Sequence, residues 1–127
     1  HAARAIDPGV SALSNAALGT PWPKVRRLSA ALSDWANRGV DGVDGLFEAL
    51  ADRERAPDES LPSTGVTLEW ERMLSAPFIV SERYGTRCST VLVVARDGEA
   101  RFVERSFDAG GRPTGIVDER FAIARRS

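Results

Sequence analysis

The 127-residue sequence has one cysteine, one histidine and no long hydrophobic run. With Cys88 as the only cysteine, no disulfide can form within the chain. With His1 as the only histidine, a Cys2His2 or three-histidine metal site is excluded. The longest apolar run, Val91 to Ala95, is far shorter than the roughly 20 residues of a membrane-spanning helix. We therefore expect no metal, no cofactor and no membrane segment.

Neither sign of charge dominates the chain. Lysine and arginine number 17, aspartate and glutamate number 18, and the net charge is -1. The sequence thus lacks the basic excess that draws nucleic acid or an anionic membrane. Its length suits a single domain over residues 1–127 with its own core, and the absence of disulfides and of a signal-peptide pattern favours the cytoplasm. The chain begins with His1 and not with Met, so we interpret it as part of a longer protein, with a natural mature terminus as the alternative.

Two amphipathic helices are predicted in the first half of the chain. Pro23 suits the first helical position and Gly39 suits the position after the last turn. A second, shorter helix follows, with Asp41 or Asp44 as its N-cap. The apolar residues at helical spacing are Val25, Leu28, Leu32 and Trp35 in the first helix and Val43, Leu46, Phe47 and Leu50 in the second. Residues 52–66 read as a long surface loop, and Thr67 as the cap of a brief third helix.

The second half of the chain reads as an antiparallel meander. Residues 89–96 form the strongest predicted strand, and their continuous apolar run indicates burial on both faces. Asp97-Gly98 predicts a two-residue type I′ turn. Further strands are expected at residues 9–15, 78–80, 100–107 and 119–124, with a turn at 110–113, and residues 108–127 form the C-terminal tail of the domain. Helices separated from strands in this way predict an α+β fold, an antiparallel sheet with helices packed on one face.

Three residues are candidates for a functional site because each stands where an element begins or ends. Asn15 ends the first predicted strand, where its amide either donates to an oxyanion or caps a turn. Trp22, between two prolines, either forms the wall of a substrate pocket or covers the start of the helix. Arg87 precedes the strongest strand and either binds an anion or forms an ordinary salt bridge. Cys88, beside it, is expected to be buried as a small hydrophobe.

Three sequence segments, in their order and spacing, resemble one known family. The first is Leu13-Ser14-Asn15 with Thr20-Pro21-Trp22-Pro23-Lys24-Val25. The second runs from Leu50-Ala51-Asp52-Arg53 to Leu61-Pro62-Ser63-Thr64-Gly65-Val66. The third is Tyr84-Gly85-Thr86-Arg87-Cys88-Ser89-Thr90-Val91, followed by the hairpin that ends at Phe102-Val103-Glu104-Arg105-Ser106-Phe107. Together they resemble the C-terminal half of the NRDE family, also called the transport and Golgi organisation 2 family.

The resemblance implies a hydrolase-like fold of the N-terminal nucleophile type, in which two sheets are sandwiched between helix layers. It also implies a Met-Cys start and an Asn-Arg-Asp-Glu motif, and this chain has neither, since Asn37-Arg38-Gly39-Val40 does not match. We therefore expect a C-terminal fragment that is inactive alone because the nucleophilic cysteine lies elsewhere. By resemblance to related acylases, Asn15 would help form an oxyanion hole and Arg87 would support the nucleophile.

The implied substrate is a small molecule with a non-peptide amide bond, and the implied partner is the missing N-terminal half or another copy of the chain. Two other functions remain open. One is a non-catalytic module that binds haem or a lipid-derived ligand between Trp22 and Arg87. The other is an interaction domain whose exposed apolar face packs on the missing half.

Overall fold

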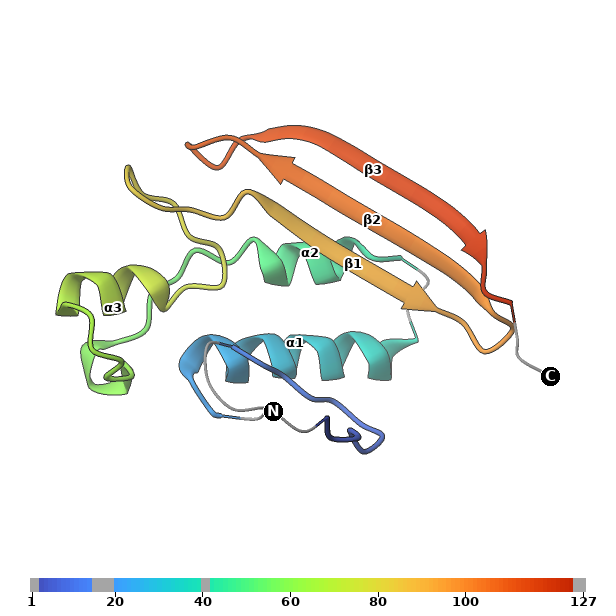
Figure 1. Cartoon of the computed structure of the whole chain (residues 1–127), viewed down its shortest axis with the longest axis horizontal. Helices are drawn as coiled ribbons and strands as arrows, with labels where there is room; N and C mark the ends of the chain where they lie inside the picture. The colour runs from blue at the N-terminus through green and yellow to red at the C-terminus, as the bar shows by residue number, and fades with distance from the viewer. Residues whose placement is uncertain (1–2, 15–19, 40–41, 125–127) are drawn as a thin grey trace.

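The computed structural model describes residues 3–14, 20–39 and 42–124. Within these residues, three α-helices precede a three-stranded antiparallel sheet, which confirms the α+β class (Figure 1). The helices are α1 (Pro23–Arg38), α2 (Asp44–Leu50) and α3 (Leu68–Leu74), with a 3-10 turn at Asp58–Ser60. The strands are β1 (Cys88–Val94), β2 (Glu99–Phe107) and β3 (Pro113–Ala122).

Helix α1 begins and ends where the sequence predicts. Pro23 occupies its first position, where a missing N–H costs nothing. Gly39 follows its last turn with φ 62°, the left-handed conformation that glycine adopts without strain. The indole N–H of Trp35 donates to the carbonyl of Gly42 at 2.8 Å, which ties the end of α1 to the approach of α2.

The two shorter helices differ in how they are capped. Thr67 caps α3 as predicted, because its hydroxyl accepts a hydrogen bond from the backbone N–H of Trp70 at 3.3 Å. For α2 the choice of Asp44 as cap is wrong, since Val43 holds that position without a side-chain hydrogen bond. Asp44 lies in the first turn and pairs with Arg105 at 3.1 Å. Asp41 lies outside the described residues.

The sheet has the order β1-β2-β3, and its register places Val91 opposite Val103 and Val103 opposite Asp118. Strand β3 is longer than predicted, because it starts at Pro113. The predicted type I′ turn is wrong. The connection runs through Ala95–Gly98 and only Gly98 has a positive φ, of 90°, whereas a type I′ turn needs two such residues.

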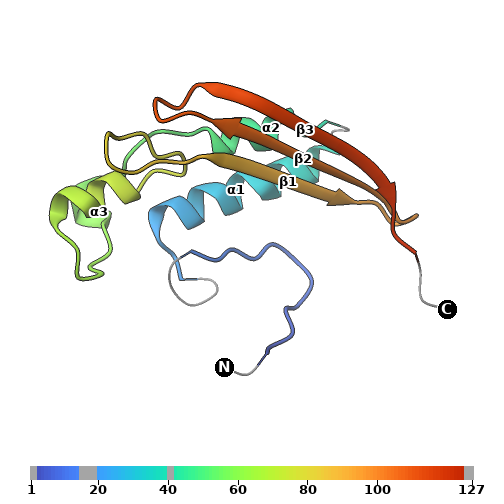
Figure 2. The same cartoon turned by 45° about the horizontal axis from the view of Figure 1, so that its top comes forward.

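Two predicted strands are absent from the described residues. Residues 9–14 contain no strand and stay apart from the sheet (Figure 2), and Asn15 itself lies outside the described part. Residues 78–80 contribute only an isolated bridge between Val80 and Gly85. Alternating residues become a strand only when a neighbouring strand pairs with them. Phe78 instead packs edge-on against Phe107, with ring centroids 4.8 Å apart.

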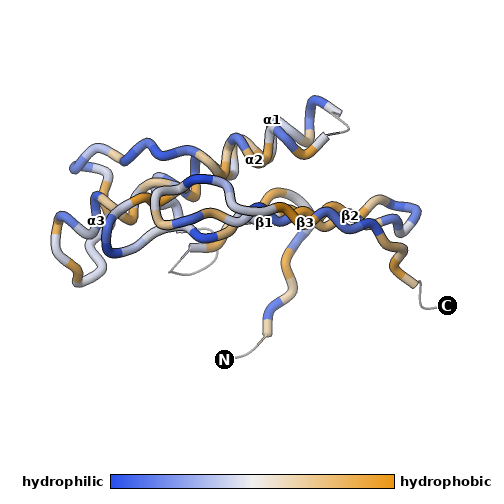
Figure 3. The backbone as a smooth tube through the Cα atoms, turned by 90° about the horizontal axis from the view of Figure 1, so that it is seen from above, coloured by the Kyte–Doolittle hydropathy of each residue, from blue (hydrophilic) through white to orange (hydrophobic). Residues whose placement is uncertain are grey.

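The main core lies between β1, β2 and the helices. Val43 and Phe47 from α2 and its N-cap pack with Val91 of β1 and Val103 of β2. Leu46, Leu50 and Val93 border this cluster, so the apolar residues predicted for the second helix do share one buried face. Figure 3 shows α1 and α2 on the same side of the sheet, which confirms that these helices cover a single face.

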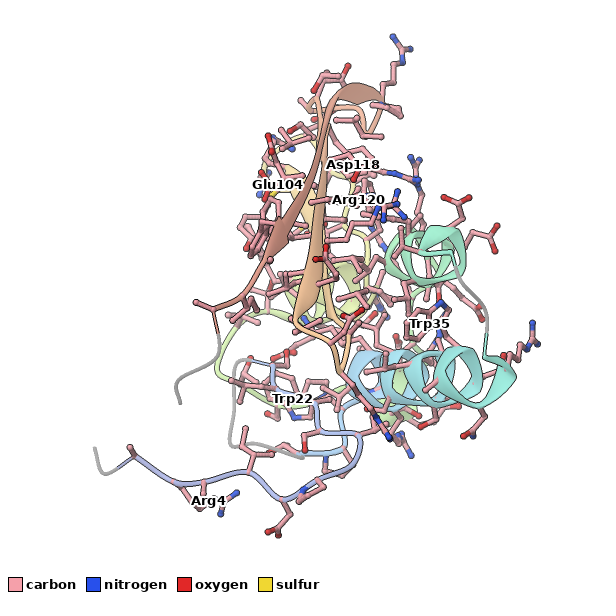
Figure 4. The ribbon with its side chains drawn as sticks, turned by 90° about the vertical axis from the view of Figure 1, so that its right-hand side faces the viewer. Arg4, Trp22, Trp35, Glu104, Asp118 and Arg120 are labelled. Atoms are coloured by element: carbon pink, nitrogen blue, oxygen red, sulfur yellow. The ribbon has the colours of Figure 1, made fainter. Side chains whose placement is uncertain are left out.

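No helix of the described residues covers the opposite face of the sheet, which we call the outer face. Strand β1 therefore alternates between buried and exposed residues, and the prediction that both of its faces are buried is wrong for this chain. Cys88 lies on the outer face and is exposed, not buried as predicted. In Figure 4 Glu104 points to this side, whereas Trp35, Asp118 and Arg120 lie on the helix side. The larger apolar residues of the outer face are Leu92, Val94, Phe102, Val117 and Phe121, and the buried Ala100 lies between Val94 and Phe121 on the same face.

No helix of the described residues is long and apolar enough to cross a membrane.

Candidate functional site

The structure places two of the three predicted site residues and does not bring them into one pocket. Trp22 lies at the N-cap of α1 and lines a hollow against α3. Arg87 lies immediately before β1, is exposed, and is not among the residues that line this hollow. Asn15 lies outside the described residues, so its predicted role stays a prediction.

The hollow beside Trp22, which we call the α1–α3 pocket, is partly open, and its empty space of about 470 Å³ includes open solvent. Three stretches form it: the start of α1 and, far from it in the sequence, the loop before α3 and α3 with the residue after it. Two of these stretches are the Thr-Pro-Trp-Pro-Lys and Leu-Pro-Ser-Thr-Gly segments on which the resemblance rests. The lining residues are Trp22, Pro23, Lys24, Pro62, Thr64, Glu71, Leu74 and Ser75.

Lys24 contributes a half-buried cation to the pocket. Its ammonium donates to the backbone carbonyl of Leu74 at 3.1 Å, which joins α1 to the end of α3. Burial lowers the pKa of Lys24 below its usual value, because the charged form loses hydration. In the described residues, no carboxylate lies within salt-bridge distance of this ammonium to offset that loss.

Glu71 contributes a buried carboxylate from the middle of α3, only 6% exposed. Its Oε1 accepts two hydrogen bonds from Thr64, one from the backbone N–H at 2.8 Å and one from the hydroxyl at 2.6 Å. These bonds fix the loop before α3 against the helix. They also hold the carboxylate in one orientation on the pocket wall.

Ser75 closes the pocket at the end of α3. Its hydroxyl donates to the carbonyl of Arg72 at 2.7 Å and accepts from the backbone N–H of Ala56 at 2.9 Å. Both functions of this hydroxyl are therefore occupied by the fold, and Ser75 is not placed to act as a nucleophile.

Arg87 is held by its backbone more than by its side chain. Its carbonyl accepts from the N–H of Phe107 at 2.8 Å, which continues the β1–β2 ladder by one step. No salt bridge is formed by its guanidinium with the described residues, so the alternative of an ordinary salt bridge at the strand end finds no support there. Its guanidinium lies close to Gly85, where an added Cβ would come within 2.9 Å of Nη1.

No group of three histidine, cysteine, aspartate or glutamate side chains in the described residues is placed to hold a metal ion.

Sequence reasoning missed Lys24 and Glu71. Lys24 is adjacent to the Trp22-Pro23 segment, and that adjacency was an available signal. The sequence offers no such signal for Glu71, because its neighbours Glu69 and Arg72 make the helix look like a solvated charged segment. Only the fold of the loop around Thr64 reveals that this carboxylate is buried.

These features define an α+β domain with a charged, tryptophan-walled pocket on one side and a bare apolar sheet face on the other. A family model described as "Transport and Golgi organisation 2" matches residues 1–109, and the chain belongs to this family.

Two curated relatives agree with this assignment. The chain is 37% identical over 119 residues to "Transport and Golgi organization protein 2 homolog" of Bos taurus, which covers 86% of this chain and 42% of the relative. It is 33% identical over 116 residues to the protein of the same name of Homo sapiens, covering 80% of this chain and 40% of the relative. The chain thus spans about two fifths of the length of these relatives.

Proposed function

We propose that this chain is the C-terminal, supporting half of a hydrolase-like protein of the N-terminal nucleophile type that acts on a non-peptide amide bond. In this proposal the nucleophilic cysteine lies on polypeptide outside this sequence, so the chain is inactive alone. The proposal places the protein in the cytoplasm. The observation that carries it is the outer face, because a sandwich of two sheets covers such a face with its second sheet.

The outer face has the character of a buried layer. Leu92 is 57% exposed, Phe121 is 46% exposed, and both lie on the face that no helix covers. Complete transfer of such a side chain out of water contributes about 1.5–3 kcal/mol, and roughly half of that gain is still available at each position, so a protein gains by covering them. The unbroken apolar run in β1, which predicts burial on both faces, is consistent with a second layer that this chain does not supply.

Residues 9–14 give independent support to a second layer. Their alternating pattern predicts a strand, yet they remain unpaired and stay apart from the sheet (Figure 2). A strand-forming segment without a partner is expected where the partner strand belongs to the missing half.

The chemistry follows from the general mechanism of this class of enzyme. The thiol of the terminal cysteine gives its proton to its own α-amine, and the sulfur attacks the amide carbonyl. The amine leaves with a proton and water then hydrolyses the thioester. Asn15 would donate a hydrogen bond to the oxyanion, and the unpaired guanidinium of Arg87 would stabilise negative charge near the sulfur.

The activity of the longer protein tests the nucleophile directly. With a series of N-acyl 4-nitroanilides as substrates, replacing the terminal cysteine by alanine should abolish 4-nitroaniline release. Unchanged turnover would reject the mechanism.

A pair of arginine variants tests the supporting role. Arg87→Ala should lower kcat by roughly 100-fold, in the range seen when one charge-stabilising donor is removed. Arg83→Ala is the matched control, because Arg83 is also exposed and lies in the same connection before β1. Equal effects of the two variants would show that Arg87 has no special role.

The α1–α3 pocket favours a second candidate, a non-catalytic module for haem or a lipid-derived ligand. Trp22 offers an aromatic wall and Lys24 a cation for a carboxylate. Arg87, expected as part of the same cleft, does not line this pocket. A haem titration followed by absorption spectroscopy discriminates the candidates, since no spectral change at micromolar haem counts against the module.

A further inference from the structure

We propose that the α1–α3 pocket binds a small molecule that carries both a carboxylate and an amide N–H. The carboxylate would pair with Lys24, the N–H would donate to Glu71, and the planar amide would lie against Trp22. This inference rests on the pocket alone and stands whether or not the protein hydrolyses anything.

The ammonium of Lys24 is held in place, but not all of its N–H donors are used. It has three N–H donors, and among the described residues it uses one, to the carbonyl of Leu74 at 3.1 Å. The half-buried side chain has lost part of its hydration without gaining an anionic partner. A ligand carboxylate would supply that partner through a charge-assisted hydrogen bond.

The carboxylate of Glu71 is likewise held in place, and only one of its two oxygens accepts hydrogen bonds from the described residues. Thr64 makes both of its bonds to Oε1, and Oε2 accepts no hydrogen bond from the described residues. Among the described residues, Oε2 is not one of the fully buried atoms that lack a partner, so it keeps some exposure, and a ligand in the pocket that brings an N–H can donate to it.

The two charges line one pocket without forming a salt bridge with each other. Lys24 is bonded to one wall through Leu74, and Glu71 to another through Thr64. A pair with a purely structural role would be expected in direct contact, because each ion then offsets the desolvation of the other. A donor and an acceptor of opposite charge therefore line the same pocket, and neither one neutralises the other.

This arrangement selects ligands by their charge pattern. A simple anion would meet the repulsion of Glu71, and a simple cation that of Lys24. A molecule with a carboxylate at one end and an N–H donor next to it satisfies both. The remaining lining of Trp22, Pro23, Pro62 and Leu74 suits a short apolar or planar portion of the ligand.

Three matched small molecules test the proposal on the unmodified chain. N-acetylglycine has both groups, levulinate replaces the N–H by a methylene, and N-acetylglycine methyl ester lacks the charge. Titrations monitored by ¹H–¹⁵N NMR should shift the indole signal of Trp22 and the amide of Thr64 with N-acetylglycine. Levulinate and the ester should each bind about tenfold more weakly, as expected for loss of one charge-assisted hydrogen bond.

Two variants assign the groups to the residues. Lys24→Met should weaken the binding of N-acetylglycine about tenfold and leave the binding of the ester unchanged. Arg26→Met, at an exposed position on the same helix, is the control. Glu71→Gln should lower the affinity for N-acetylglycine toward the affinity for levulinate, because the neutral amide is a weaker acceptor than the carboxylate. Glu69→Gln is its exposed control on α3.

Several results would overturn the proposal. One is the absence of shifts at Trp22 and Thr64 with N-acetylglycine up to millimolar concentration. Another is equal affinity for all three molecules, which would show that the pocket recognises neither the carboxylate nor the N–H. The comparison of ligands needs no variant, so it remains decisive even if Lys24→Met or Glu71→Gln fails to fold.

Discussion

At the scale of single residues, Phe47 joins the apolar core to a charged network. Its side chain is 3% exposed, and the guanidinium of Arg105 lies 4.0 Å from its ring centroid. The same guanidinium pairs with Asp44 one helical turn earlier. One ring therefore fills the space between α2 and the sheet and also supports a cation above it.

Truncation of Phe47 should be among the most damaging single changes. Phe47→Ala should lower the free energy of unfolding by about 3–5 kcal/mol, because it leaves a cavity and removes the cation–π contact. Phe47→Leu is the control and should cost far less, since it retains most of the apolar volume. Urea denaturation measures both, and a loss below about 1 kcal/mol for the alanine variant would contradict this description of the core.

Because of Lys24, the stability of the chain should vary with pH in the alkaline range. Its pKa is lowered by burial, so the unfolded chain binds more protons than the folded chain between the folded value and about 10.4. Stability from this group therefore increases as pH rises through that window, and the benefit is absent below it. Lys24→Met should remove this increase in unfolding experiments from pH 8 to pH 11, whereas an unchanged pH profile would show that burial of Lys24 costs nothing.

Residue-level prediction from the sequence succeeds where a side chain acts locally. Thr67 caps a helix through its own hydroxyl, and Pro23 starts one through its ring, so neighbouring residues suffice to predict both. Cys88 and Glu71 depend on the fold instead. Which side of β1 the helices cover decides that Cys88 is exposed, and the path of a loop decides that Glu71 is buried.

At the scale of elements, the turn between β2 and β3 depends on one glycine. Gly111 is buried and has φ 77°, which is unfavourable for other residues. A Cβ there would lie 3.0 Å from Val80 and 3.1 Å from Phe78. The turn therefore packs its backbone directly on the core beneath it.

Substitution of this glycine should disturb the hairpin. Gly111→Ala should cost more than about 1 kcal/mol, the sum of a left-handed conformation and a close contact. Gly115→Ala, in β3 with nothing within 4 Å of a new Cβ, is the control and should be close to neutral. Thermal unfolding of the two variants compares them, and equal midpoints would contradict the packing of the turn.

Element-level prediction from the sequence is correct for the amphipathic helices and for the β1–β2 hairpin. The apolar patterns of these elements depend on contacts with residues that are close in the sequence. It is wrong for residues 9–14, because an alternating pattern fixes a strand only when a partner is present. It is wrong for burial of β1 on both faces as well, since the helices of the described residues cover only one face of the sheet.

At the scale of the whole molecule, the uncovered outer face should govern association. An apolar sheet face exposed to water favours self-association. The chain alone should therefore sediment as a concentration-dependent mixture. Replacing Leu92 and Phe121 together by lysine should shift it to monomer, while Ile6→Lys, an equally exposed apolar position outside the sheet, should have no effect. Clean monomer at all concentrations would contradict this expectation.

The central claim is that this face is an interior surface of a larger sandwich. The exposed fractions of the Leu92 and Phe121 side chains in an experimental structure of the longer protein test it most directly. The claim predicts that both side chains become buried beneath a second sheet that also pairs with residues 9–14. If both remain as exposed as in this chain, at 57% and 46%, the claim is contradicted.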